Sequence, residues 1–559
     1  MNVEIYLYIL PIVLAGILQG GYFVYASAIL STGMFIGIIV NILKKKKLYL
    51  TLDMNFLIIL IVCLMYFIVT IWGIDRGMSL MGGIKFLPLL LYFIIVSGHI
   101  NKKEIMIEML PMLGTCMTIF SFLMMQFPVF EKTVSVAGRL SGFFQYPNTY
   151  ALFMLICLII AISKINIKKI DWIWCLYTFV SIFGIVMSGS RTILLLMIIL
   201  AIIFCIIKSK VSKKLLLAII TSSILLIFIL WITGFGKEVI IRLLNTNGST
   251  FWGRLLYMKD AINMILDHPF GLGYYGYHYI QTSYQTGVYS LVNVHNELLQ
   301  LMLDIGVIPA ILFYGMLIRS CLSKKTNFRN KIILGIIILH SLFDYDFQFL
   351  VIAMVTILFL NTGDLKEISI SWLTKTFTLA VSIGIIILSG ITGLSDFYYL
   401  QDMTDKSLKI YTGNTEARIE LLQKANSTKK MEKIANKIID NNQYVSIAYS
   451  ASAQVCFAKG DMEGYIKNKL IAIQLAPYQY NEYEDYLKTL AYAEGEYLKN
   501  DDIESAKECV KRAKSIPSLL NNVKLNTSIL GWKINDTPKV LLSHENLELI
   551  KEMESKINE

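Results

Sequence analysis

Long apolar runs recur from Ile5 to Gly393, and they restrict the possible folds of this chain more than any other feature. Each run has about 17–22 residues, the length that a helix needs to cross the hydrocarbon core of a bilayer. The mean hydropathy of +0.60 agrees with this interpretation. The first run, near residues 6–18, is followed directly by another, so we expect no cleaved signal peptide. The sequence therefore predicts an all-α, polytopic membrane protein.

Basic residues cluster in every second loop between these runs, as the positive-inside rule requires of cytoplasmic loops. The clusters are Lys44–Lys47, Lys102–Lys103, Lys164–Lys169, Lys208–Lys214 and Arg319–Lys331. We therefore attribute the net charge of +11 to membrane topology. A nucleic-acid partner is not expected, because a protein that binds one gathers its charge on a single soluble face.

With these loops inside, we predict about 12–13 membrane spans, a cytoplasmic N-terminus and an extracytoplasmic C-terminal domain. The predicted spans are 4–20, 22–43, 54–73, 81–98, 104–126, 147–163, 171–187, 192–208, 215–234, 296–318, 331–345, 347–361 and 374–393. The segments 331–345 and 347–361 are short, and one re-entrant hairpin is the alternative there.

Residues 395–559 contain no run of spanning length and are rich in Lys, Glu, Asp and Asn. We therefore divide the chain into a transmembrane domain, 1–394, with a long outer loop at about 235–294, and a soluble domain, 395–559. Paired amphipathic segments with Gly460-Asp461 between them and Ala476-Pro477 after them resemble tetratricopeptide repeats. Stacked helix pairs form concave surfaces for peptides or proteins, which would suit a cell-envelope partner. A structural lid is the alternative.

A histidine stands where the long outer loop meets the predicted span 296–318, in the sequence Val294-His295-Asn296-Glu297. Polar groups at this depth are costly unless they are used or paired. An imidazole with an ordinary pKa near 6.5 suits proton abstraction from a hydroxyl, so we predict that His295 is a general base, with Asn296 or Glu297 orienting it. The alternative is an interfacial histidine that only caps the span.

Isolated arginines on the predicted outer side are not explained by topology. Arg191 follows Ser188-Gly189-Ser190 at the start of a span, where small residues expose backbone N–H groups and a guanidinium adds phosphate contacts. Arg254 heads an amphipathic segment in the long loop. We predict that these arginines bind an anion, the alternative being interfacial anchors. Weaker candidates of the same kind are Arg76, Arg139 and Arg242.

The remaining polar residues do not predict a metal site. His340 and Asp344 are one helical turn apart and are expected to form a supporting pair. The first outer loop carries no acidic residue that could bind a divalent cation. The eight cysteines include no CxxC pair that could bind a metal ion. We therefore expect no metal and no cofactor. The tyrosines of the long loop are explained most simply by an aromatic belt at the membrane interface, although they could also stack on sugar rings.

Taken together, the motifs resemble those of the O-antigen ligase and polymerase superfamily, which includes the protein O-oligosaccharyltransferases. The resemblance covers roughly residues 50–360. Its motifs are Gly138–Phe143 through Pro147-Asn148, Ser190-Arg191, Arg254 before Asp267–Gly273, His295-Asn296 before Leu298, Asp304–Gly306, and His340-Ser341 with Asp344.

This resemblance implies a GT-C-like bundle in a bacterial cytoplasmic (inner) membrane. It also implies a metal-independent, inverting transfer of a glycan from undecaprenyl pyrophosphate to an acceptor hydroxyl on the outer face. Arg191 and Arg254 would hold the pyrophosphate and His295 would be the base or the acceptor-orienting group. Fixed positive charge near the leaving group is a main source of catalysis in such sites.

Several alternatives stay open at this point. A multispan carrier of an anion or a lipid-linked sugar would also use outward arginines, although it would be expected to place charge at the membrane midplane. A non-catalytic cell-envelope assembly protein would depend on the C-terminal helices alone. Within the enzyme class, a ligase and a polymerase use the same donor, so these residues do not separate them, and the acceptor can be a glycan, a lipid or a protein.

Overall fold

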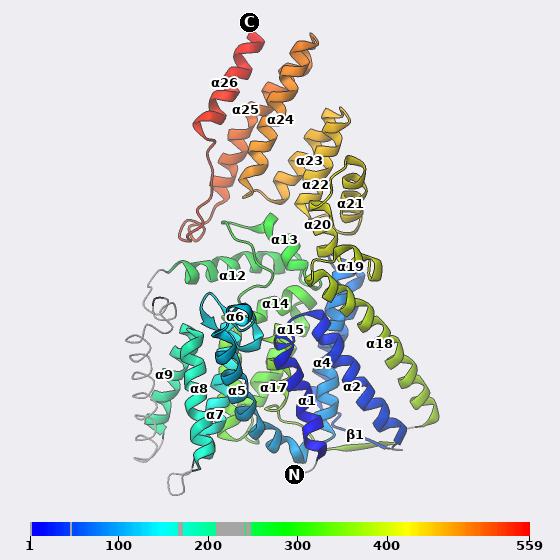
Figure 1. The fold of residues 1–559 in the computed structure, drawn as a ribbon, viewed down its shortest axis with the longest axis vertical. Helices are drawn as coiled ribbons and strands as arrows, with labels where there is room; N and C mark the ends of the chain where they lie inside the picture. Colours follow the sequence, from blue (N-terminus) through cyan, green and yellow to red (C-terminus); the bar gives the residue numbers. More distant parts are fainter. Residues whose placement is uncertain are drawn as a thin grey trace.

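Figure 1 shows a computed structural model of the chain, which describes residues 3–44, 47–165, 171–207, 241, 248–369 and 371–558. These residues are mostly helical, which confirms the predicted all-α class. The described strands form two short antiparallel pairs. Strand β1 (Lys47–Leu50) pairs with β4 (Lys366–Ser369), and β2 (Ser135–Val136) pairs with β3 (Arg139–Leu140).

A bundle of apolar helices fills the lower part of Figure 1. Its described members are α1 (Val3–Ile17), α2 (Val24–Lys44), α3 (Met54–Ile68), α4 (Arg76–Ser97), α5 (Lys103–Met125), α7 (Pro147–Lys164), α8 (Trp172–Ser188), α9 (Arg191–Ile207), α15 (Val307–Leu322), α16 (Phe328–Ser341), α17 (Leu350–Ile357) and α18 (Trp372–Leu400). Within the described ranges, six helical segments are long and apolar enough to cross a membrane: 24–43, 54–71, 76–97, 103–125, 147–164 and 372–400. The chain is therefore a multi-pass membrane protein. The predicted span 215–234 lies outside the described residues.

The predicted lysine-rich loops that the structure describes meet at one end of the bundle, which we call the basic end. There Lys103 Nζ donates to the Leu360 carbonyl at 2.5 Å, and Arg329 forms a bidentate pair with Glu104 at 2.8 and 2.9 Å. Strands β1 and β4 pair at the same end, where the N-terminus also lies (Figure 1). The common location of these loops agrees with their predicted cytoplasmic placement, and the side of the membrane stays a prediction.

The segment 331–361 forms two passes along the bundle instead of a hairpin from one end. Arg329, at the start of α16, lies at the basic end beside Glu104. Asp344 contacts Arg254 at the opposite end, and Leu360 is back at the basic end beside Lys103. Helix α16 and the segment that begins with α17 therefore each run between the two ends.

The predicted single span at 296–318 is wrong, because the helix breaks at Gly306. Helix α14 (Glu297–Ile305) ends there and α15 begins at Val307. Gly306 has a φ of 94°, a conformation that glycine adopts without strain. The turn 269–273 binds the backbone on both sides of the break, with the Val307 N–H donating to the Pro269 carbonyl at 3.0 Å. Helix α14 therefore lies at the end of the bundle opposite the basic end, with α12 (Ser249–Asp267) and α13 (Gly276–Tyr284) (Figure 1).

The C-terminal helices sit on this second end of the bundle (Figure 1). They are α19 (Thr404–Ile410), α20 (Thr415–Gln423), α21 (Thr428–Asn441), α22 (Ser446–Ala458), α23 (Met462–Leu475), α24 (Tyr480–Lys499), α25 (Ile503–Asn526) and α26 (His544–Asn558). Helix α18 runs through residue 395 to Leu400 and carries the chain from the basic end to them. Thr415 Oγ1 donates to Asp75 at 2.5 Å, and Tyr411 donates to the Gly77 carbonyl at 2.9 Å. These contacts fix the C-terminal helices to the start of α4.

Candidate active site

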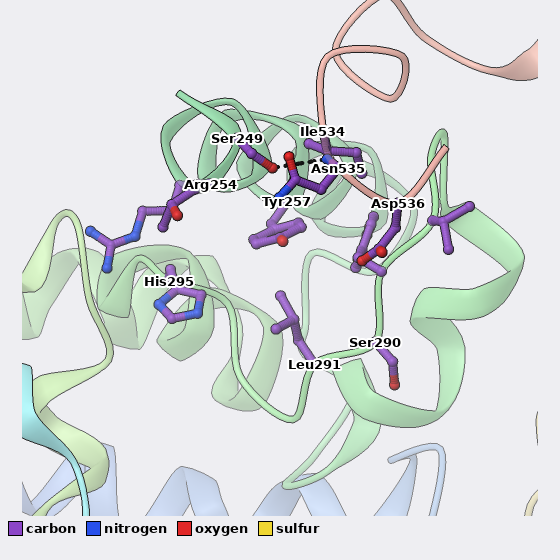
Figure 2. Close-up of a pocket in the computed structure, with 12 residues that line it drawn as sticks. Ser249, Arg254, Tyr257, Ser290, Leu291, His295, Ile534, Asn535 and Asp536 are labelled. Carbon is purple, nitrogen blue, oxygen red and sulfur yellow. Dashed lines mark hydrogen bonds between the residues drawn. The ribbon is translucent and has the colours of Figure 1, made fainter. Parts of the chain in front are cut away.

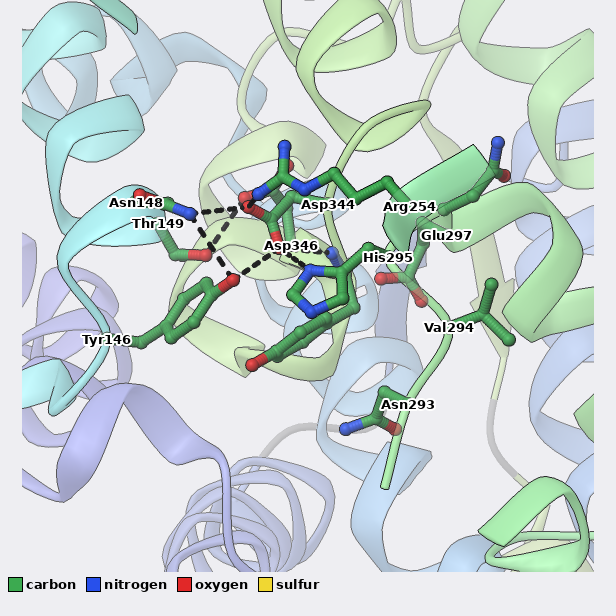
Figure 3. Close-up of polar contacts among 12 residues, drawn as sticks. Tyr146, Asn148, Thr149, Arg254, Asn293, Val294, His295, Glu297, Asp344 and Asp346 are labelled. Carbon is green, nitrogen blue, oxygen red and sulfur yellow. Dashed lines mark hydrogen bonds and ion pairs between the residues drawn. The ribbon is translucent and has the colours of Figure 1, made fainter. Parts of the chain in front are cut away.

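One buried carboxylate organises the end of the bundle that carries the C-terminal helices. Asp344 lies in the loop between α16 and the short helix η5 (Asp346–Gln348), and its side chain is 1% exposed. Oxygen Oδ1 accepts from the Tyr146 hydroxyl at 2.6 Å and from the Tyr345 N–H at 3.1 Å, and it lies 3.2 Å from His295 Nδ1. Oxygen Oδ2 accepts from Asn148 at 2.8 Å and from Arg254 Nη2 at 3.3 Å (Figure 3).

The cations around Asp344 keep it ionised. Burial raises the pKa of this carboxyl, but the hydrogen bond from His295 and the neighbouring charges, that of Arg254 among them, outweigh burial and hold the pKa well below its usual range. An ionised carboxylate can only accept hydrogen bonds, so Nδ1 of His295 must be the donor. The other ring nitrogen, Nε2, is then left to exchange a proton with a substrate.

Local sequence signals place these side chains. Pro147 occupies the first turn of α7, where a missing N–H costs nothing, and it brings Tyr146 and Asn148 to the end of the bundle. Asn296 caps α14 by accepting from the Leu299 N–H at 3.0 Å. Its amide also donates to the Leu342 carbonyl at 2.9 Å, so the loop with Asp344 and the segment with His295 are held together.

Two predicted pairings differ from the structure. Asn296 and Glu297 do not orient His295, because Asn296 is a helix cap and the Glu297 carboxylate accepts from the Phe347 N–H and the Gln348 amide, both at 3.0 Å. His340 pairs with Asp346 at 2.6 Å and not with Asp344. The tight turn after α16 places Asp346 beside His340 and directs Asp344 towards His295.

Two of the predicted arginines join this network. Arg254, on α12, binds Asp344 directly. Arg139 is buried; its Nε donates to the Ser188 carbonyl at 2.7 Å and its Nη2 donates to Asn148 at 2.8 Å. Arg139 therefore connects the end of α8 with Asn148, which in turn binds Asp344.

The other predicted arginines are placed differently. Arg191 is exposed at the first turn of α9, next to buried Ser190, whose carbonyl accepts from the Leu194 N–H at 3.0 Å. Arg76 is exposed at the start of α4, beside the contact of Asp75 with the C-terminal helices. Arg242 lies outside the described residues.

Arg254 and His295 border one cavity of about 310 Å³ (Figure 2). Its lining residues are Ser249, Thr250, Arg254, Tyr257, Val288, Tyr289, Ser290, Leu291, His295, Ile534, Asn535 and Asp536. Arg191 is not among them. Among the described residues, the buried Nε of Arg254 has no hydrogen-bond partner, so this guanidinium is not fully paired. Within the described ranges, no three His, Cys, Asp or Glu side chains are grouped to hold a metal ion.

The arrangement places an imidazole, whose outer nitrogen can take a proton, beside a guanidinium that can bind a phosphate. Residues 176–314 match the O-antigen ligase family model. This segment runs from α8 into α15 and contains Ser190, Arg191, Arg254 and His295. The match supports the predicted ligase and polymerase superfamily and a membrane glycosyltransferase-like role. No curated protein and no solved structure matches the chain.

The O-antigen ligase match ends before Asp344 and begins after Arg139, so these residues complete the site from outside the matched segment. From its sequence position, Asp344 is expected only to support His340, and Tyr146 has no predicted role. Tyr146 stands in the motif that continues to Pro147-Asn148, which was a usable signal. No sequence signal brought Asn535 and Asp536 to the cavity, because they follow His295 by more than two hundred residues.

Proposed function

We propose that this protein moves a glycan from undecaprenyl pyrophosphate to an acceptor hydroxyl on the extracytoplasmic face of the bacterial cytoplasmic membrane. Support comes from the O-antigen ligase match at residues 176–314 and from the multi-pass helical bundle. Further support comes from the cavity that Arg254 and His295 share. That cavity is the observation on which the proposal depends.

His295 takes the role of general base. The Asp344 carboxylate accepts from Nδ1, fixes the tautomer and stabilises the imidazolium when it forms. The acceptor hydroxyl gives its proton to Nε2 while its oxygen forms a bond to the anomeric carbon of the donor. The proton later passes from the imidazolium to water, which restores the base.

Arg254 takes the role of leaving-group binder. As the new bond forms, the bond between the anomeric carbon and the pyrophosphate oxygen breaks, and its electron pair stays on that oxygen. The leaving undecaprenyl pyrophosphate needs no proton, and a guanidinium stabilises the negative charge that develops on it. Arg139 adds positive charge near this site, because its Nη2 donates to Asn148 Oδ1 at 2.8 Å. Arg191 binds the pyrophosphate or guides it from the start of α9. The attack inverts the anomeric configuration.

The test is glycan transfer by purified protein in lipid nanodiscs, with a labelled undecaprenyl-pyrophosphate oligosaccharide as the donor. His295→Ala should lower the transfer rate by a factor on the order of 10²–10⁴, the usual contribution of a positioned base. His544→Ala is the matched control, because that imidazole is 87% exposed on the far helix α26. Unchanged transfer by His295→Ala would exclude His295 as the base.

The products also separate the remaining possibilities. Chain growth with the donor alone indicates a polymerase, whereas transfer only after addition of a second acceptor indicates a ligase. Accumulation of the intact donor on the opposite side of a sealed vesicle, with no new glycosidic bond, would indicate a carrier and contradict the proposal.

A further inference from the structure

One wall of the cavity comes from the C-terminal end of the chain. Ile534, Asn535 and Asp536 belong to the connection between α25 and α26, residues 527–543, which we call the capping loop. Figure 2 shows Tyr257 between Arg254 on one side and Asp536 on the other. The long loop and His295 supply the rest of the lining, so the cavity is complete only when the capping loop is in place.

Backbone hydrogen bonds hold the capping loop against the long loop. The N–H of Ser528 donates to the Thr286 carbonyl at 2.9 Å, and its hydroxyl donates to the same carbonyl at 3.2 Å. Thr286 is itself anchored, because its N–H and hydroxyl donate to Asp260 on α12 at 2.9 and 2.8 Å. A buried carboxylate on the membrane side therefore fixes the position of the loop above it.

A second set of contacts lies closer to the cavity. The Asn535 N–H donates to Ser249 Oγ at 2.9 Å, and Lys533 Nζ lies 4.3 Å from the centre of the Trp252 ring. Both partners belong to the first turn of α12, the helix that carries Arg254. The capping loop is therefore attached at two places, to Thr286 in the long loop and to the first turn of α12.

Two glycines allow the loops to approach this closely. A Cβ on Gly287 would lie 2.7 Å from the Gly531 Cα, and a Cβ on Gly531 would collide with the Thr286 carbonyl. Any side chain at Gly531 must therefore push the capping loop away from the membrane side. This position gives a way to open the wall without touching a lining side chain.

The lining on the side of the capping loop has the chemistry of a sugar site. The rings of Tyr257 and Tyr289 lie 4.6 Å apart and offer apolar faces, while Ser249 and Ser290 offer hydroxyls. Asp536 adds a carboxylate that can accept from two hydroxyls at once. The charge of Asp536 acts on Tyr257 in the cavity lining. Burial raises the pKa of Tyr257, the Asp536 charge raises this pKa further, and the Arg254 charge lowers it.

We infer that the capping loop completes a subsite for a sugar ring of the acceptor, in which Asp536 accepts from the ring hydroxyls while the ring packs against Tyr257. This inference rests on the proposed function, because it uses His295 as the base that marks the acceptor position. Arg254 occupies the donor side of the cavity, so the acceptor ring lies towards Asp536. The C-terminal helices thereby take part in acceptor selection.

The first test compares acceptor and donor kinetics of Asp536→Asn in nanodiscs, with methyl glycosides of hexoses and N-acetylhexosamines as acceptors. The KM for the glycoside should rise about tenfold, because hydrogen bonds to a charged group are stronger than those to an amide, and the KM for the donor should stay unchanged. Asp440→Asn, an exposed residue on α21, is the matched control. An equal rise in the donor KM would overturn the assignment to the acceptor.

The second test measures binding without transfer. Saturation-transfer NMR should detect the methyl glycosides on the wild-type protein, and Gly531→Ala should weaken that binding severalfold, whereas Gly495→Ala should not, because a Cβ at Gly495 meets no atom within 4 Å. Glycoside binding without transfer of the labelled glycan to any acceptor, glycoside, lipid or peptide, would contradict the proposed function and support the subsite. Absence of glycoside binding to the wild type would overturn the subsite.

Peptide acceptors test the alternative that the capping loop binds a peptide and not a sugar ring. Serine- and threonine-containing peptides lack vicinal hydroxyls, so Asp536→Asn should leave their transfer or binding within about twofold of the wild-type value. A loss confined to the peptide, with the glycoside unaffected, would replace the sugar subsite with a peptide-binding wall and refute the inference.

Discussion

The two ends of the helical bundle are both rich in cations, but they pair them in different ways. At the basic end, Arg329 and Lys164 pair with Glu104, whose side chain is half exposed, and Lys103 binds a backbone carbonyl. At the opposite end, Asp344 is 1% exposed and collects Arg254 and His295. Exposed pairs contribute little, whereas a buried carboxylate depends on each of its partners. We propose that charge at the first end specifies topology and that charge at the second end positions chemical groups.

The largest expected effect comes from Asp344→Asn. This carboxylate is ionised at neutral pH because its pKa lies below the usual range, so the substitution removes a full negative charge. An amide can also present its NH₂ group to His295, which would select the wrong imidazole tautomer and place the proton on Nε2. Loss of the correct tautomer in an Asp–His pair lowers the catalytic rate by a factor on the order of 10⁴.

The measurement for Asp344→Asn is the initial rate of glycan transfer together with the melting temperature in detergent. We expect a lower melting temperature as well, since removal of one partner from a buried ion pair costs about 3–5 kcal/mol. A variant that keeps transfer within tenfold of the wild-type rate would show that Asp344 is not the orienting group. The buried charges at the second end would then not be shown to position chemical groups.

The second largest effect is expected for Arg254→Lys. Lysine keeps the charge but not the planar fork of donors that binds two phosphate oxygens together. We expect the KM for the pyrophosphate donor to rise about 10–100-fold, with a smaller change in the acceptor KM. Arg319→Lys at the basic end is the matched control, because Arg319 donates to Asn55 at 2.7 Å, a contact that an ammonium can replace. Equal effects of the two substitutions would contradict a phosphate role for Arg254.

Features that depend on local pattern were predictable from the sequence. The spans at α2, α5 and α7 follow from uninterrupted apolar composition, and the lysine-rich loops follow from the same pattern. The location of Arg139, Arg254 and His295 at one end of the bundle followed from counting spans. Each of these predictions needs only a short window of residues and the positive-inside rule.

Features that depend on packing between distant segments were not predictable. His295 and Asp344 are separated by 49 residues and meet only because α16 returns to the same end of the bundle. The break after Ile305 required knowing that the turn 269–273 binds the backbone at Gly306, since glycine alone is tolerated inside a helix. The expected partners Asn296 and Glu297 were neighbours in sequence, but the start of α14 turns them towards other groups.

The contacts of the capping loop were only partly predictable from the sequence. Nothing in residues 527–543 identifies a partner in the long outer loop. A connection of this length without helix or strand is nevertheless uncommon in a compact helical array, and such connections are usually functional. The Gly531-Trp532 pair within a polar segment was therefore a signal that a contact exists, although it did not indicate where.

The smallest effect is expected for Glu104→Gln at the basic end. Glu104 contacts Arg329 and Lys164, but half of its side chain is exposed, so water and salt screen the pairs and the free energy of unfolding should change by about 1 kcal/mol or less. Membrane orientation should also stay unchanged, because acidic residues contribute little to the positive-inside rule. The checks are the melting temperature, the transfer rate and the protease accessibility of a C-terminal tag in oriented vesicles. A loss of transfer as large as that of Asp344→Asn, with orientation intact, would show that the basic end is coupled to the site and that the two ends do not divide their roles.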